Sequence, residues 1–252
     1  AAIRDGAVQI YYQPLVDLRT EQIAGFEALA RWTHQTLGNV PPDRFIPIAE
    51  SCGLMNELTD HLLRQASRDA CQWPANVTLA FNISPSQLQD RTFGLRVLSI
   101  LAESGLSPRR LEIEITESAL VQDVESAQQL LGELHDAGVR IALDDFGTGY
   151  SSLAYLKQLP IDEIKIDKSF VMHMNSNENN AIIVRSLIGL GHNLGLMVVA
   201  EGVESQEVWG QLKALGCDYA QGYCMGRPIP QEKMWDWLAQ SPWGINPKEP
   251  RE

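Results

Sequence analysis

Short runs of β-branched and other apolar residues alternate along almost the whole chain with longer segments of helical period. Such alternation is typical of βα units around a parallel sheet. Eight runs are predicted as strands: 8–12, 23–31, 77–83, 111–116, 139–144, 163–166, 196–200 and 218–221. This count and the chain length predict an α/β fold, a TIM-like (β/α)8 barrel. An open, doubly wound sheet shows the same alternation and is the alternative.

The segments between the predicted strands carry helix signals. Apolar residues in 124–134 lie on one helical face, which Asp123 is placed to cap and Gly138 to end. Residues 187–194, followed by Gly195, have the same design. Strand and helix signals therefore agree on one repeating βα pattern.

Length and charge limit the class of protein. No long linker divides the 252 residues, so we predict a single domain over 1–252, excised from a longer protein. The formal net charge of −12 disfavours broad binding to nucleic acid or an anionic membrane. We therefore expect no nucleic-acid partner and no direct membrane contact from this domain. The four scattered cysteines favour a reducing compartment, so we expect a cytoplasmic domain. This expectation is compatible with a membrane anchor elsewhere in the longer parent protein.

Polar side chains recur at the carboxyl ends of the predicted strands, where barrel enzymes hold their chemistry. They are Glu27, Asn82, Glu114, Asp144, Asp145, Lys165, Asp167, Glu201 and Gln221. With Glu204 there are seven acids, and Arg31 and Lys165 are too few to neutralise them. Mg²⁺ or Mn²⁺ suits a site of carboxylates and one amide oxygen. The plain alternative is that each acid caps a helix or faces solvent.

Eight segments closely resemble, in order, motifs of the EAL family, bacterial phosphodiesterase domains that linearise cyclic di-GMP. They are YYQP (11–14), FEALARW (26–32), FNIS (81–84), EITES (114–118), LDDFGTGYSSL (143–153), IKIDKSF (164–170), AEGVE (200–204) and QGY (221–223). The resemblance extends from about residue 8 to about residue 238. It implies a barrel whose first strand runs antiparallel to its neighbours.

The same resemblance implies a role for each matching residue. One metal ion would be bound by Glu27, Asn82, Glu114 and Asp144, and a second would be held or oriented by Asp144, Asp145 and Glu201. The catalytic set is Lys165, Glu201 and Glu27, with Lys165 positioning the attacking water. The substrate contacts are Gln13, Leu29, Arg31 and Gln221, and the supporting acids are Glu117, Asp167 and Glu204. The alternative for Lys165 is a structural salt bridge to Asp167 or another nearby acid.

The expected reaction is hydrolysis of cyclic di-GMP to linear pGpG by in-line attack of a metal-bound hydroxide. Coordination lowers the pKa of water from about 16 to about 7, and two ions stabilise the entering and leaving oxygens. We expect Ca²⁺ to inhibit, because its longer bonds and looser geometry disturb a tight magnesium site.

Regulation and partners are also implied by the resemblance. Gly147 and Gly149 predict a movable loop after the acidic pair, and in the family this loop is linked to a dimer contact, so we expect a homodimer. Sensory or cyclase-like domains are expected upstream. The main alternative function is a catalytically silent cyclic di-GMP receptor, and another is a barrel enzyme acting on a different phosphate or carboxylate. The complete acidic set favours activity, and the matches at Gln13 and Arg31 favour cyclic di-GMP.

Overall fold

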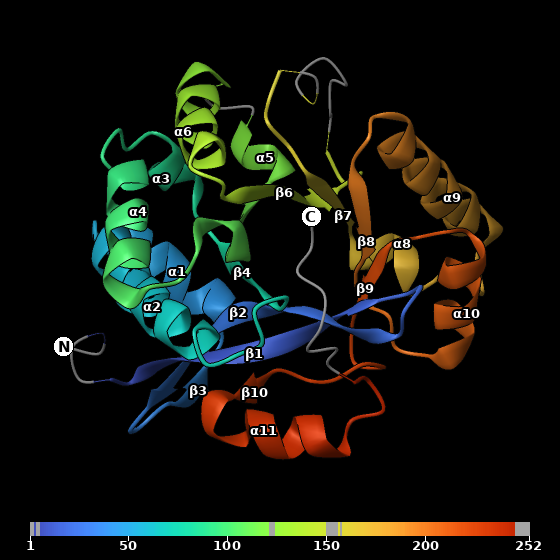
Figure 1. Cartoon of the computed structure of the whole chain (residues 1–252), viewed down its shortest axis with the longest axis horizontal. Helices are drawn as coiled ribbons and strands as arrows, with labels where there is room; N and C mark the ends of the chain where they lie inside the picture. The colour runs from blue at the N-terminus through green and yellow to red at the C-terminus, as the bar shows by residue number, and fades with distance from the viewer. Residues whose placement is uncertain (1–2, 4–5, 121–123, 150–155, 157, 245–252) are drawn as a thin grey trace.

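Eight strands form a closed barrel at the centre of the molecule (Figure 1). The computed structural model describes residues 3, 6–120, 124–149, 156 and 158–244. The barrel strands are β1 (Val8–Asp17), β2 (Gln22–His34), β4 (Thr78–Asn82), β5 (Leu111–Thr116), β6 (Arg140–Phe146), β7 (Glu163–Ile166), β8 (Met197–Ala200) and β9 (Tyr219–Gln221). All eight predicted strands are present, and β1 and β2 extend well beyond their predicted ends. The barrel prediction is confirmed.

The first strand closes the ring. β1 pairs with β2 on one side and with β9 on the other, antiparallel in both cases, whereas the pairs from β2 through β4 to β9 are parallel. An open doubly wound sheet has two free edges, so this closure excludes that alternative. Two short strands, β3 (Gly38–Val40) and β10 (Ile229–Pro230), extend β2 and β1 outside the ring. They were not predicted, because runs of two or three residues carry no readable period.

Helices cover the outside of the barrel (Figure 1). They are α1 (Pro42–Ser51), α2 (Met55–Ala70), α3 (Pro85–Leu88), α4 (Phe93–Ser104), α5 (Glu117–Leu120), α6 (Val124–Asp136), α8 (Lys168–Val171), α9 (Glu178–Asn193), α10 (Gln206–Ala214) and α11 (Gln231–Gln240), with a 3-10 turn at Pro108–Arg110. The figure shows α11 beneath β1, apart from the other helices. Within the described ranges, no helix has the length and apolar character needed to cross a membrane.

The predicted helix α6 shows how the sequence pattern produces the packing. Its Ala127, Leu131 and Leu134 are buried against the core, and Gly138 follows the helix with a φ of +98°, a conformation that favours glycine. The expected cap, Asp123, lies outside the described residues. The buried face of α9 consists instead of Val184, Ile188 and Gly191, since Leu187 and Leu190 are only partly buried at its edge.

The barrel interior contains two layers of buried charge. Residues two apart on a strand point to the same face, so Glu112 and Glu114 on β5 both point inward, as do Glu163 and Lys165 on β7. In the lower layer, Arg140 Nη2 lies 3.4 Å from Glu112 Oε2 and 3.3 Å from Glu163 Oε2. Burial alone would lower the pKa of Arg140, but these two carboxylates raise it above the ordinary value. The upper layer, at the carboxyl ends of the strands, is the candidate site.

Candidate functional site

The predicted polar residues meet at one end of the barrel. Glu27 lies on β2, Glu114 on β5 and Lys165 on β7, and all three are buried. Asn82 and Gln221 are the last residues of β4 and β9. Parallel strands end at the same rim, so residues separated by up to 194 positions in the chain become neighbours.

A bulge in β6 brings two consecutive acids to this rim. Leu143 pairs with Ile164 and Phe146 with Ile166, so Asp144 and Asp145 together occupy a stretch opposite one residue of β7. Asp145 has a left-handed backbone with a φ of +55°, which aspartate tolerates better than most residues, and its N–H donates to Asp144 Oδ1 at 2.8 Å. In a regular strand the two side chains would point to opposite faces.

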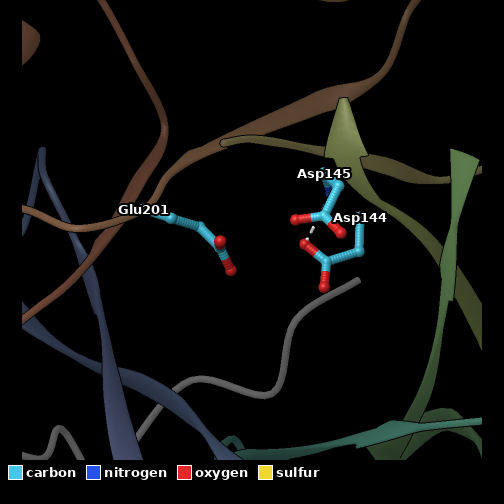
Figure 2. A group of neighbouring side chains, drawn as sticks. All are labelled: Asp144, Asp145 and Glu201. Carbon is cyan, nitrogen blue, oxygen red and sulfur yellow. Dashed lines mark hydrogen bonds between the residues drawn. The ribbon is translucent and has the colours of Figure 1, made fainter. Parts of the chain in front are cut away.

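These two acids and Glu201, which follows β8, form a candidate metal centre. One oxygen from each of the three carboxylates lies within 4.8 Å of the others. Figure 2 shows Asp144 and Asp145 on one side and Glu201 on the other, with their carboxylates directed into the space between them. No other group of three acidic, histidine or cysteine side chains is this close within the described ranges.

Lys165 lies at the centre of the carboxylates and is only 1% exposed. Its Nζ is 2.7 Å from Glu114 Oε1 and 2.8 Å from Glu201 Oε1. Asp144 Oδ1 and Glu27 Oε2 lie farther away, at 3.7 and 4.0 Å. The contacts are close ion pairs without the angles of good hydrogen bonds. One buried ammonium is therefore the shared counter-charge of four carboxylates.

Two side-chain amides complete this layer. Asn82 Nδ2 donates to Glu27 Oε1 at 2.6 Å and to Glu114 Oε2 at 2.8 Å. Gln221 Nε2 donates a very short hydrogen bond to Glu27 Oε2 and a longer one, 3.4 Å, to Gln13 Oε1. Gln13 lies directly across from Glu27 in the β1–β2 pairing. The amides hold the two glutamates in position and partly offset their negative charge.

The pKa values show that this compensation is incomplete. Burial tends to raise the pKa of Glu27, but Lys165 and the hydrogen bonds together bring that pKa below its ordinary value. Burial and the neighbouring charges of Glu27 and Asp144 hold the pKa of Glu114 well above its usual range despite Lys165. Burial, together with Asp144 and Glu27, raises the pKa of Glu201 to about 7. The pKa of Lys165 is raised by the same carboxylates against the effect of burial, so this side chain stays charged.

A pH-dependent loss of stability follows for the metal-free protein. Because the folded pKa of Glu201 lies above the unfolded value of about 4.3, its contribution is fully present below pH 4.3 and is lost as pH rises through about 7. With EDTA present, we expect urea unfolding to show a falling free energy from pH 5 to pH 8. The fall should be smaller in Glu201→Gln, because the substitution removes one of the carboxyl groups with a raised pKa. Parallel pH profiles for the two proteins would contradict this assignment.

A cavity of about 540 Å³ opens onto the carboxylates. Its acidic lining consists of Glu27, Asp144, Asp145, Glu201 and Glu204. Its other side chains include Gln13, Leu29, Lys168, Met172, Gln221 and Tyr223. The cavity therefore joins the candidate metal centre to a mixed polar and apolar wall large enough for a small molecule.

Three predicted residues lie at the edge of this arrangement. Arg31 is half-buried and donates to the carbonyl oxygen of Ala30 at 2.9 Å, and it does not line the cavity. Asp167 caps α8 by accepting from the backbone N–H of Ser169 at 3.0 Å. Glu117 is buried and accepts from the N–H of Gly147 at 3.2 Å, in the loop after the acidic pair. The last four residues of the motif LDDFGTGYSSL, 150–153, lie outside the described residues.

The cavity also contains residues to which the sequence assigned no role. Lys168 and Met172 come from α8 and its end, and Tyr223 follows β9. Tyr223 is 50% exposed, and the Arg227 guanidinium stacks on its ring 4.1 Å from the centroid. Lys168 and Tyr223 lie inside the motifs IKIDKSF and QGY. Adjacency to Asp167 and Gln221 was the available signal for both.

Comparison with known proteins places the chain in a family. The EAL domain model matches residues 1–228. The chain is similar to an uncharacterized signaling protein of Caulobacter vibrioides, with 46% identity over 98% of this chain and 30% of that protein. It is also similar to the cyclic di-GMP phosphodiesterase PA2567 of Pseudomonas aeruginosa, with 39% identity over 91% of this chain and 40% of that protein. The chain thus spans less than half the length of these curated relatives.

A solved structure agrees with the sequence comparison. The PaMucR phosphodiesterase in complex with c-di-GMP superposes with a TM-score of 0.89 and 37% identity, over 92% of this chain and 96% of that one. The residues matched by the family model include every strand that carries the acidic site. The chain belongs to the EAL domain family.

Proposed function

We propose that this domain hydrolyses cyclic di-GMP to linear pGpG with the help of divalent metal ions. The observation that carries the proposal is the group of Asp144, Asp145 and Glu201, which lies beside Lys165 and lines a cavity of about 540 Å³. Relatives named as cyclic di-GMP phosphodiesterases support the choice of substrate, and so does the neighbouring structure that holds c-di-GMP.

The residues fit a divalent ion by charge and by donor chemistry. Carboxylate oxygens are the preferred ligands of Mg²⁺ and Mn²⁺, and the single ammonium of Lys165 lies among four carboxylates here. Asp144, Asp145 and Glu201 would hold one ion. The second set would be Glu27, Asn82, Glu114 and Asp144. Asn82 would present its oxygen to an ion only after its amide turns over, because Nδ2 now faces the glutamates.

The chain's own groups then have distinct parts in the hydrolysis. Water adds to phosphorus, the bond from phosphorus to one ribose 3′ oxygen breaks, and a proton passes to that oxygen. Bound divalent ions would activate the water at neutral pH and stabilise charge on the phosphate. Lys165 remains protonated and stabilises the negative charge that develops beside Glu114 and Glu201. Glu201 would hold the ion from the side of the site opposite Asp144 and Asp145.

Several groups would hold the substrate. Gln13, Gln221 and Leu29 line the cavity beside Glu27, where two amides and an apolar side chain can contact a base or a ribose. Arg31 uses Nη1 for its hydrogen bond to Ala30 and has further N–H groups that would bind a phosphate. Two of the supporting acids bind backbone N–H groups: Glu117 in the loop at Gly147 and Asp167 at the start of α8. The third, Glu204, lines the cavity. We further propose that the domain operates within a longer protein, because the relatives that it matches extend well beyond it.

Turnover of the purified domain tests the proposal directly. We expect cyclic di-GMP to be converted to pGpG with Mg²⁺ or Mn²⁺, and the reaction to stop when EDTA is added and resume when the metal is restored. Chromatography of the nucleotides measures both compounds. Ca²⁺ in place of Mg²⁺ should lower the rate at least roughly tenfold, because its longer bonds and looser geometry disturb a tight site.

The same experiment separates the enzyme from a receptor. Tight binding of cyclic di-GMP with no product after long incubation with Mn²⁺ would assign the domain as a binding module. Turnover that persists in EDTA would contradict the metal-dependent mechanism. Homodimer formation is a separate proposal, and sedimentation of the domain at several protein concentrations tests it.

A further inference from the structure

The cavity wall contains one cation that the proposed chemistry has not used. Among the described residues that line the cavity, five are carboxylates and Lys168 is the only lysine or arginine. Lys165 is enclosed among the acids, and Arg31 lies outside the lining. An anionic substrate that enters this cavity therefore meets one accessible ammonium on its wall.

The backbone holds Lys168 in a defined place. It is the first residue of α8, directly after the capping Asp167. Gly202 packs against it so closely that a Cβ on residue 202 would lie 2.5 Å from the Lys168 Cβ. Gly202 has a φ of +68° and follows Glu201. The stem of Lys168 is thus fixed beside the loop that carries Glu201.

The ammonium itself remains available. The side chain of Lys168 is exposed, and it forms no ion pair with any of the carboxylates that the structure describes. Lys168 lines the same cavity as Asp144, Asp145 and Glu201. Lys168 is therefore close enough to act on the acidic centre without being neutralised by it.

The chemistry of the substrate supplies the partner. Cyclic di-GMP has two phosphodiesters in one ring, and each carries a negative charge. When one phosphate lies at the acidic centre, the ring keeps the other inside the same cavity, where the carboxylates repel it. We propose that Lys168 binds the phosphate that is not cut, and thereby favours a cyclic dinucleotide over substrates with a single phosphodiester. This inference rests on the proposed function.

Two substrates and three variants test the inference. We expect Lys168→Gln to raise the KM for cyclic di-GMP roughly tenfold, as loss of a charge-assisted hydrogen bond does, with kcat changed less than twofold at saturating Mn²⁺. Lys168→Arg should keep the KM within about threefold. Lys213→Gln is the matched control, because Lys213 is also an exposed lysine but pairs with Glu21 away from the cavity. Rising salt should raise the KM of the wild type more steeply than that of Lys168→Gln.

Bis(4-nitrophenyl) phosphate, which has one phosphodiester, distinguishes the possible causes. Lys168→Gln should lower kcat/KM for cyclic di-GMP and change it less than twofold for this probe. An equal fall in kcat/KM for both substrates would mean that Lys168 acts on the acidic centre rather than on the second phosphate, and it would overturn the inference. An unchanged KM for cyclic di-GMP would overturn it as well. A wild-type domain that cuts the probe and leaves cyclic di-GMP intact would contradict the proposed function instead.

Discussion

Glu27→Gln should lower kcat for cyclic di-GMP by about 100-fold or more while the barrel stays folded. The side chain is buried and keeps its shape in the variant. In the wild type, the two carboxylate oxygens of Glu27 accept from Asn82 and Gln221. The substitution removes the negative charge that would bind the metal ion, and it turns an NH₂ group toward one of those two donors. Loss of one ligand weakens the binding of the metal ion and disturbs its position in the site. Steady-state kinetics over a range of Mn²⁺ concentrations measures the effect.

Glu112→Gln is the matched control for this result. Glu112 is also a buried glutamate inside the barrel, but it pairs with Arg140 in the lower layer, away from the cavity. We expect Glu112→Gln to lower stability and to keep kcat within about threefold of the wild type at a temperature where it is folded. Wild-type turnover in Glu27→Gln at saturating Mn²⁺ would refute the role of Glu27 as a ligand.

Lys165→Met should cause the largest loss of stability in the metal-free protein. The variant keeps the apolar stem but leaves Glu114, Glu201 and their neighbours without a counter-charge. Removing one partner of a buried ion pair costs about 3–5 kcal/mol. Urea unfolding in EDTA should show this fall in the free energy of unfolding. Added Mn²⁺ should restore part of it, because an ion that binds only the folded state stabilises that state.

An exposed lysine gives the comparison. Lys213 lies 2.5 Å from Glu21 at the surface, and an exposed pair is worth about 1 kcal/mol or less. We expect Lys213→Met to lower the free energy of unfolding by no more than that amount, and we expect Mn²⁺ to stabilise this variant as it does the wild type. Equal losses in the two variants would contradict the central charge role of Lys165. Turnover by Lys165→Met should be severely reduced even when Mn²⁺ has restored its fold.

Much of the site was predictable because parallel strands end at one rim. Glu114 and Glu201 were placed together from strand order alone, although they are 87 positions apart in the chain, and the structure brings both to Lys165. The alternative that each acid merely caps a helix or faces solvent fits Asp167, which caps α8. It does not fit Glu27 or Glu114, which are buried inside the barrel.

Other features depended on contacts that no local pattern encodes. The prediction ended the fifth strand at residue 144, whereas β6 continues to Phe146 through a bulge that aims Asp144 and Asp145 at the same site. The place of Lys168 on the cavity wall depends on how α8 packs against Gly202.

The sequence alone determined the eight strands and the end of the sheet that holds the acids. Those features follow from local periodicity and from the geometry of parallel strands. Only the tertiary structure decided the closure by β1, the ion pairs of Lys165 and the cation that faces the cavity. The reason is physical: register and close packing join residues that are far apart in the chain, and burial sets the pKa of groups such as Glu201 only once the barrel has closed.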